Sequence, residues 1–110
     1  MKSKLLAAVA TGAVALAAWA VPSMAGGTTT VLVKDNKFVP KTLTVVKGTT
    51  VKWVWKGKER HNVAVAKGPS KFRASTRKKG HFTHTFKKRG TYRLVCTIHA
   101  PDMRMRVTVK

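Results

Sequence analysis

Three side chains that can bind a metal ion lie within eight residues of one another: Cys96, His99 and Met103. A thiolate, an imidazole and a weak thioether suit a metal that cycles between Cu(I) and Cu(II). Zinc, calcium and magnesium sites favour other sets of donors. The best candidate for a fourth donor is His61, which precedes the cysteine by 35 residues. The sequence therefore predicts one copper site made of two histidines, a cysteine and a methionine.

Other interpretations of these residues remain open from the sequence. Cys96 is the only cysteine, and a free cysteine is often a buried structural thiol. His61 has no local motif beyond the neighbouring asparagine, so a surface histidine is its alternative. A zinc hydrolase site of Cys96, His61 and His99 with an open position is a further hypothesis, but it leaves Met103 without a role.

The segments that must position these donors show a two-residue hydrophobic period and no convincing helical one after residue 25. Turn signals containing glycine separate the segments. This pattern predicts an all-β domain, a Greek-key β-sandwich of about seven to eight strands. The expected strands span residues 28–33, 42–46, 49–56, 61–66, 82–87, 91–96 and 104–110.

The side-chain alternation predicts which residues face the core. Cys96 shares its parity with Leu94, so the thiol should point into the sandwich. Met103 and Met105 share parity with Val107 and should both point inward. Parity alone therefore leaves the choice of the weak fourth ligand open between these two methionines.

Other notable residues receive simpler interpretations. Trp53 and Trp55 occur at strand spacing, and core packing is the expected role of both. His81 and His84 are three residues apart, which in a strand places them on opposite faces, so we expect them to be structural or surface residues. The basic segment 67–80 is the least regular part, and we expect it to be a long surface connection.

The first 25 residues predict a secretory signal peptide. A charged start is followed by an apolar stretch and a small-residue cleavage pattern at Ser23-Met24-Ala25. The apolar run approaches the length of a membrane span, so a retained anchor is the alternative. Residues 26–110 then form one small domain, exported to the periplasm or to the outside of the cell. Its single cysteine excludes an internal disulfide.

Residues 26–110 carry 21 basic side chains against three acidic ones, a net charge of +18. Such a charge steers encounters with anionic surfaces and favours a monomer, but it does not specify a reaction. Specific nucleic-acid binding is not expected, whereas association with an anionic cell envelope is a hypothesis. A module that binds polyanions is the function that charge alone would suggest.

At the level of motifs the chain resembles the cupredoxins, small blue copper proteins of the plastocyanin and amicyanin type. The resemblance covers residues 28–110 and depends on His61-Asn62, on Gly90 to Cys96 leading into the loop, and on the closing strand from Met103 to Val109. It implies a type 1 copper bound by His61 Nδ1, Cys96, His99 Nδ1 and a weak axial Met103. Alignment of the closing strand backwards from Val107 selects Met103 over Met105.

The resemblance also implies functions for the surroundings of the metal. Asn62 is expected to connect its loop to the cysteine loop by hydrogen bonds, with a similar role for the Thr97 hydroxyl. A hydrophobic patch around His99, made of Ala100, Pro101 and Phe38, would pass electrons to a partner.

Electron transfer without enzymatic activity is the function that the resemblance implies. The partner would be an acidic redox protein such as a cytochrome or a copper or haem oxidoreductase. The alternative is an exported copper carrier or storage protein that uses the same ligands.

Overall fold

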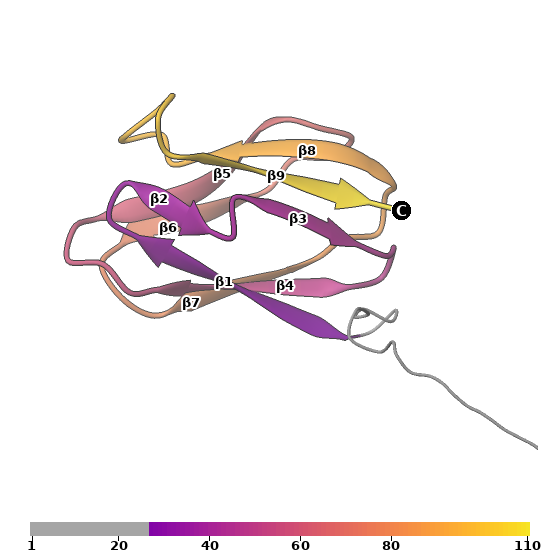
Figure 1. Cartoon of the computed structure of the whole chain (residues 1–110), viewed down its shortest axis with the longest axis horizontal. Helices are drawn as coiled ribbons and strands as arrows, with labels where there is room; N and C mark the ends of the chain where they lie inside the picture. Colours follow the sequence, from indigo (N-terminus) through magenta and orange to yellow (C-terminus); the bar gives the residue numbers. More distant parts are fainter. Residues whose placement is uncertain (1–26) are drawn as a thin grey trace, which may run out of the picture.

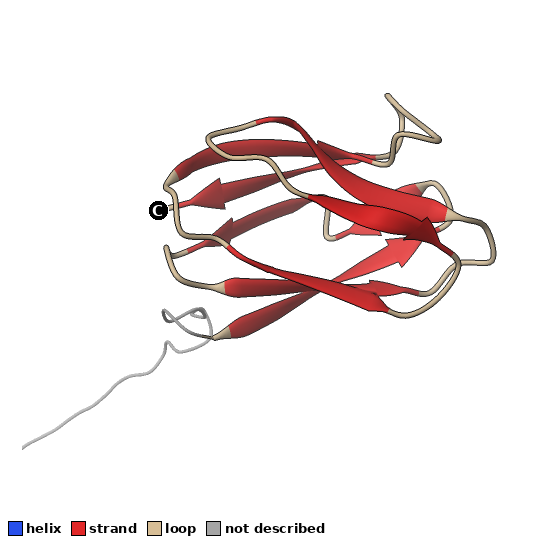
Figure 2. Cartoon of the chain, turned by 180° about the vertical axis from the view of Figure 1, so that it is seen from behind, coloured by secondary structure: helices blue, strands red, loops and turns tan. Residues whose placement is uncertain are grey.

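The computed structural model describes residues 27–110, which form two β-sheets packed face to face (Figures 1 and 2). The predicted signal peptide, residues 1–25, and its alternative as a membrane anchor lie outside the described residues. Within residues 27–110 there is no helix that is long and apolar enough to cross a membrane. The prediction of an all-β sandwich is confirmed, with nine strands in the described part of the chain instead of seven to eight.

Each sheet contains both parallel and antiparallel pairs. The four-stranded sheet has the order β2-β1-β4-β7, and the five-stranded sheet has the order β3-β9-β8-β5-β6. The parallel pairs are β1 with β4 and β3 with β9. The strands are β1 (Thr28–Lys34), β2 (Lys37–Val39), β3 (Thr42–Val45), β4 (Thr50–Trp55), β5 (His61–Lys67), β6 (Arg73–Arg77), β7 (His81–Thr85), β8 (Gly90–Val95) and β9 (Arg104–Val109).

Two strands were missed by the sequence analysis, and one expectation was wrong. The segment 67–80 is not a long irregular connection, because it contains β6, which pairs antiparallel with β5. In β6 only Ala74 is buried, so this edge strand lacks the apolar alternation that predicts a strand. The other missed strand, β2, has three residues, and its pairing with β1 follows from a two-residue turn at Asp35-Asn36. Asn36 has a φ of 66°, a conformation that asparagine tolerates in such turns.

The inner faces of the two sheets supply the hydrophobic core. Trp53 and Trp55 are buried, as predicted, and Cys96, Met103 and Met105 also point inward, which confirms the parity assignment. Strand β8 is held at its start by the Tyr92 hydroxyl, which donates a hydrogen bond to the Lys88 carbonyl at 2.8 Å. The fully buried large side chains are Trp53, Tyr92, Phe38, Phe86, Leu94, Met103 and His61 with five valines.

His84 belongs to an aromatic cluster at the edge of this core. Its imidazole stacks on Phe72, with ring centroids 3.8 Å apart, and meets Phe86 edge-on at 5.0 Å. Burial lowers the pKa of His84 below its ordinary value of 6.5. His81, on the same strand, is exposed. The two histidines are therefore structural and surface residues, as the sequence predicted.

We predict that His84 makes stability depend on pH. Below about pH 6.5 the unfolded chain takes up a proton at His84 before the folded chain does, because the folded pKa is lowered. Above the pKa that His84 has in the unfolded chain, the neutral imidazole therefore contributes fully to the free energy of unfolding. This contribution is lost as the pH falls through the lower pKa that His84 has in the folded chain. Denaturant unfolding of the metal-free protein between pH 8 and pH 5 should show a smaller loss of stability for His84→Gln than for the original chain.

The matched control is His81→Gln, which removes an exposed imidazole from the same strand. It should change the pH dependence of unfolding less than His84→Gln does. An equal effect of both substitutions would contradict the role of burial at His84.

Candidate metal centre

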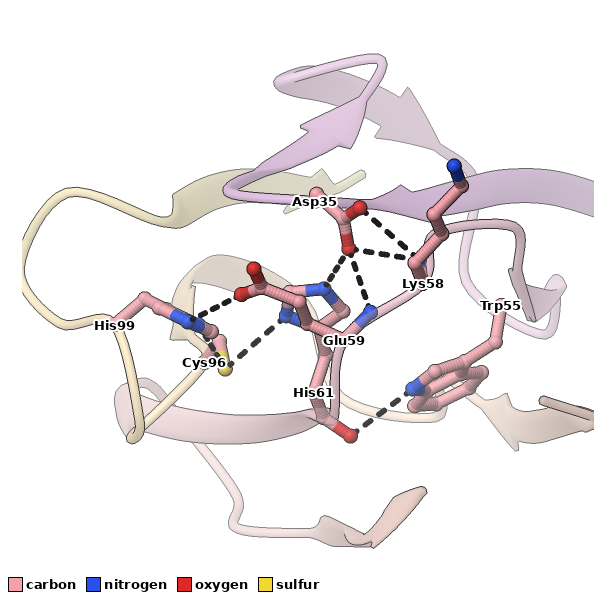
Figure 3. Close-up of polar contacts among 7 residues, drawn as sticks. All are labelled: Asp35, Trp55, Lys58, Glu59, His61, Cys96 and His99. Carbon is pink, nitrogen blue, oxygen red and sulfur yellow. Dashed lines mark hydrogen bonds and ion pairs between the residues drawn. The ribbon is translucent and has the colours of Figure 1, made fainter. Parts of the chain in front are cut away.

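The structure brings His61, Cys96 and His99 together at the end of the sandwich where β5 begins and β8 ends (Figure 3). One donor atom from each residue lies within 4.8 Å of the other two. His61 and Cys96 are fully buried, whereas the His99 side chain keeps 24% of its surface exposed. The three residues are the only group of this kind, with three or more His, Cys, Asp or Glu, in the described part of the chain.

The two imidazoles present the same nitrogen to the sulfur. The Cys96 Sγ atom lies 3.9 Å from His61 Nδ1 and 3.5 Å from His99 Nδ1. The ring centroids of the histidines are 5.0 Å apart. Both Nε2 atoms point away from the sulfur and contact carboxylates instead (Figure 3). This arrangement leaves three donor atoms facing one common point.

Backbone hydrogen bonds close the loop between β8 and β9 into a compact turn. The His99 N–H donates to the Cys96 carbonyl, the Met103 N–H donates to the His99 carbonyl, and the Cys96 N–H donates to the Met103 carbonyl, all at 3.0–3.2 Å. Met103 is fully buried at the base of this loop. Met105 is also buried, but its Sδ atom accepts a hydrogen bond from Trp53 Nε1 at 3.5 Å.

Asn62 joins the two segments that supply the donors. Its Oδ1 atom accepts from the Thr97 backbone N–H, and its Nδ2 atom donates to the Thr97 hydroxyl, both at 2.8 Å. Asn62 is 1% exposed. The connection that the resemblance led us to expect is therefore present, and it uses both the backbone and the hydroxyl of Thr97.

Asp35 orients the His61 side chain. It lies in the turn between β1 and β2, and its Oδ1 accepts a hydrogen bond from His61 Nε2 at 2.9 Å. The same carboxylate accepts from the backbone N–H groups of Lys58 and Glu59 at 3.0 Å. These bonds, that of His61 foremost, lower the pKa of Asp35 from 3.8 to about 2. A Cβ atom at Gly57 would collide with this carboxylate, so glycine is required there.

A second carboxylate accompanies the other histidine. Glu59 Oε1 lies 3.5 Å from His99 Nε2. Sequence reasoning missed both Asp35 and Glu59, because the turn and the loop that carry them meet the site only in the folded chain. The sequence did contain one usable signal, the scarcity of acidic residues. The whole chain has three of them, and besides Asp35 and Glu59 the third is Asp102, in the loop of the proposed donors.

The predicted hydrophobic patch needs one correction. Phe38 is fully buried in the core, because β2 pairs with β1 and turns this side chain inward. It therefore cannot contribute to a surface around His99. Ile98, which is 51% exposed, lies beside His99 in the loop instead. Ala100 and Pro101 are exposed, as expected for members of such a patch.

The donor set fits copper. A thiolate with two imidazoles in a buried, preformed group is the arrangement of type 1 copper sites, which add a weak axial ligand such as methionine. A hydrogen bond from the outer nitrogen of a histidine, such as that of His61 Nε2 to Asp35, is a typical support of a metal ligand. The cluster is compatible with a single type 1 copper site.

Comparison with known proteins agrees with this chemistry. The family of copper binding proteins described as the plastocyanin/azurin family matches residues 26–110. No match was found among curated proteins.

Solved structures share the fold. A variant of amicyanin with Cu(I) is 30% identical, with a TM-score of 0.67 over 76% of this chain and 82% of that chain. A purple cupredoxin from Nitrosopumilus maritimus is 22% identical, with a TM-score of 0.65 over 74% of this chain and 98% of that one, and supports the fold alone. A copper-containing nitrite reductase from Thermus scotoductus SA-01 is 30% identical, with a TM-score of 0.64 over 74% of this chain. This chain spans only 22% of that reductase.

We predict that Asn62→Ala destabilises the metal-free protein by about 1–3 kcal/mol, since two hydrogen bonds worth about 0.5–1.5 kcal/mol each are lost. Denaturant unfolding would measure the change in the free energy of unfolding. Thr76→Ala is the matched control, because the Thr76 hydroxyl lies 3.5 Å from Asn62 Nδ2, at the limit of a hydrogen bond. A loss as large for Thr76→Ala as for Asn62→Ala would contradict the assignment of this stability to the Thr97 contacts.

Proposed function

Because the chain belongs to the plastocyanin/azurin family of copper-binding proteins, we propose that it transfers single electrons through one copper ion held by His61, Cys96, His99 and Met103. Proteins of this cupredoxin family are typically electron-transfer proteins. When bound, the copper would supply one-electron chemistry between Cu(I) and Cu(II). The observation that carries the proposal is the common point faced by Cys96 Sγ and both Nδ1 atoms.

The contacts of the two buried methionines support Met103 as the axial ligand. The Sδ atom of Met105 already accepts the Trp53 indole N–H, which gives this methionine a role in the core. Met103 follows the donor loop directly and is tied to Cys96 and His99 through backbone hydrogen bonds.

The two histidines would have different functions. His61 is enclosed and held by Asp35, so it fixes one side of the site. His99 reaches the surface at the end of the sandwich, beside the exposed Ile98. We assign His99 as the residue through which electrons leave and enter, and the loop around it as the docking surface for an acidic redox partner.

We propose an electron carrier and not an enzyme, because the four protein donors complete a coordination set and leave no position for a substrate. Nitrite reduction belongs to the much longer neighbour, of which this chain spans about a fifth.

We further propose that residues 1–25 direct export and are removed, so that residues 26–110 act as a monomer in the periplasm or at the cell surface. The charged start, the apolar stretch and the cleavage pattern support this assignment.

The first experiment adds Cu(II) to the purified protein and records its visible absorption. We expect intense colour from thiolate-to-copper charge transfer, bleached by ascorbate and restored by ferricyanide with the copper retained. Cys96→Ser should abolish the colour completely. A colourless protein that binds copper and releases it to a chelator would contradict electron transfer and support the carrier or storage function.

Exchange of each methionine tests the axial ligand. We predict that Met103→Leu keeps the colour but raises the reduction potential, because a thioether that stabilises Cu(II) is lost. Met105→Leu is the matched control of similar volume, and it should leave the potential nearly unchanged while costing stability through the Trp53 contact. Voltammetry of both variants measures the potentials. A shift caused by Met105→Leu and not by Met103→Leu would reverse the assignment.

A further inference from the structure

The outer face of the five-stranded sheet carries a row of cations that the metal site does not use. Strand pairing places Arg106 of β9 directly opposite Arg93 of β8, and Arg93 directly opposite Lys67 of β5. Opposite residues of neighbouring strands have their Cβ atoms about 5 Å apart. Like charges at such positions destabilise a sheet. The free protein therefore holds three positive charges side by side at a cost.

A β-bulge completes this row. The register of β5 against β8 shifts between Val65 and Lys67. Bulges change the direction of side chains along a strand. With this extra residue, Lys67 faces Arg93 across the ladder, so the bulge adds the third cation to the row.

The row lines a hollow together with hydroxyl groups. Thr42 of β3 faces Arg106, and the next row along the sheet joins Thr44, Thr108 and Thr91. The hollow has a volume of about 580 Å³. A neighbouring hollow of about 490 Å³ shares Thr42, Arg93 and Arg106 with it and extends to Pro101 in the donor loop. The residues that line the first hollow are Thr42, Thr44, Lys67, Thr91, Arg93, Arg106 and Thr108.

No acidic side chain of this protein neutralises the row. The three acidic residues of the chain are Asp35, Glu59 and Asp102, and all lie in loops at the end that carries the proposed donors. Asp35 and Glu59 contact His61 and His99. The cations of the hollow are therefore available to pair with an external anion.

We propose that this hollow binds the phosphate group of a soluble phosphorylated anion. Guanidinium groups bind phosphate oxygens through paired hydrogen bonds, and threonine hydroxyls add further donors. Three cations match a phosphate with two or more negative charges better than a single carboxylate. The cations lie in a single row across three neighbouring strands, which matches the linear charge of a small or chain-like phosphate. This site is separate from electron transfer and does not depend on it.

The test uses the Cu(I)-loaded protein, which is diamagnetic, and inorganic pyrophosphate as the probe. At a constant ionic strength of about 0.15 M, exposed charges more than about 8 Å apart are largely screened. We expect amide NMR shifts confined to the strands around Thr91, Arg93, Arg106 and Thr108, and a melting temperature that rises with pyrophosphate. Titration calorimetry gives the dissociation constant.

The double substitution Arg93→Gln with Arg106→Gln should weaken pyrophosphate binding by about tenfold or more, because charge-assisted hydrogen bonds are lost. Without pyrophosphate the same variant should melt at or above the temperature of the original protein, since the opposed charges are gone. The matched control, Lys37→Gln with Lys79→Gln, removes two exposed charges elsewhere and should bind as the original protein does.

Three results would overturn the proposal. They are amide NMR shifts spread over the whole surface, an equal loss of binding in the double lysine control variant, and no binding of pyrophosphate to the original protein. The phosphate could come from a soluble anion or from a lipid headgroup. Binding to vesicles of phosphatidylglycerol, compared with binding to vesicles of phosphatidylcholine, distinguishes these two sources. Binding to the anionic vesicles that requires Arg93 and Arg106, without binding of pyrophosphate, would replace the soluble ligand by a lipid headgroup.

Discussion

The structure depends on the requirement that donors from two separate segments meet at one buried point. Pairing of Ala64 with Val95 aligns β5 and β8, and it places the start of one strand beside the end of the other. Beyond the last ladder pair, the Asn62 amide continues the connection by bonding to Thr97. A buried imidazole and thiol would be costly without such fixed partners, since unsatisfied polar groups are destabilising in the interior. The hydrogen bonds of Asn62 therefore connect the two segments whose donor atoms form the metal-binding geometry.

The distribution of charge follows from the same requirement. Two of the three acidic side chains contact the histidines: the Asp35 carboxylate accepts from His61 Nε2, and the Glu59 carboxylate lies beside His99 Nε2. Asp35 also binds two backbone N–H groups of the segment before β5, so one carboxylate holds both the imidazole and the loop that delivers it. A low pKa keeps this carboxylate ionised under all mild conditions. Basic side chains occupy the remaining surface, where solvent screens them.

Sequence alone predicted those features that depend on local alternation. The inward direction of Cys96, the core position of Trp53 and the sandwich itself follow from a period of two residues. Strand β6 was missed because its polar residues form an edge strand that only pairing with β5 defines. Phe38 was misplaced for a similar reason, since a three-residue strand shows no period. The role of Asp35 depends on a turn folding against a loop 23 residues away, and no local pattern encodes that contact.

Strands β8 and β9 show how one small sheet can serve two purposes. Their inward residues, such as Leu94 and Met105, pack in the core beneath the metal centre, while Arg93 and Arg106 face outward into the hollow. Because alternate residues of a strand point to opposite faces, the chemistry of one face can change without altering the other. The proposed phosphate site and the proposed copper site thus share a scaffold but no side chain. Three strands link the two sites along the backbone: β8 ends one residue before Cys96, β9 begins one residue after Met103, and β5 runs from His61 to Lys67.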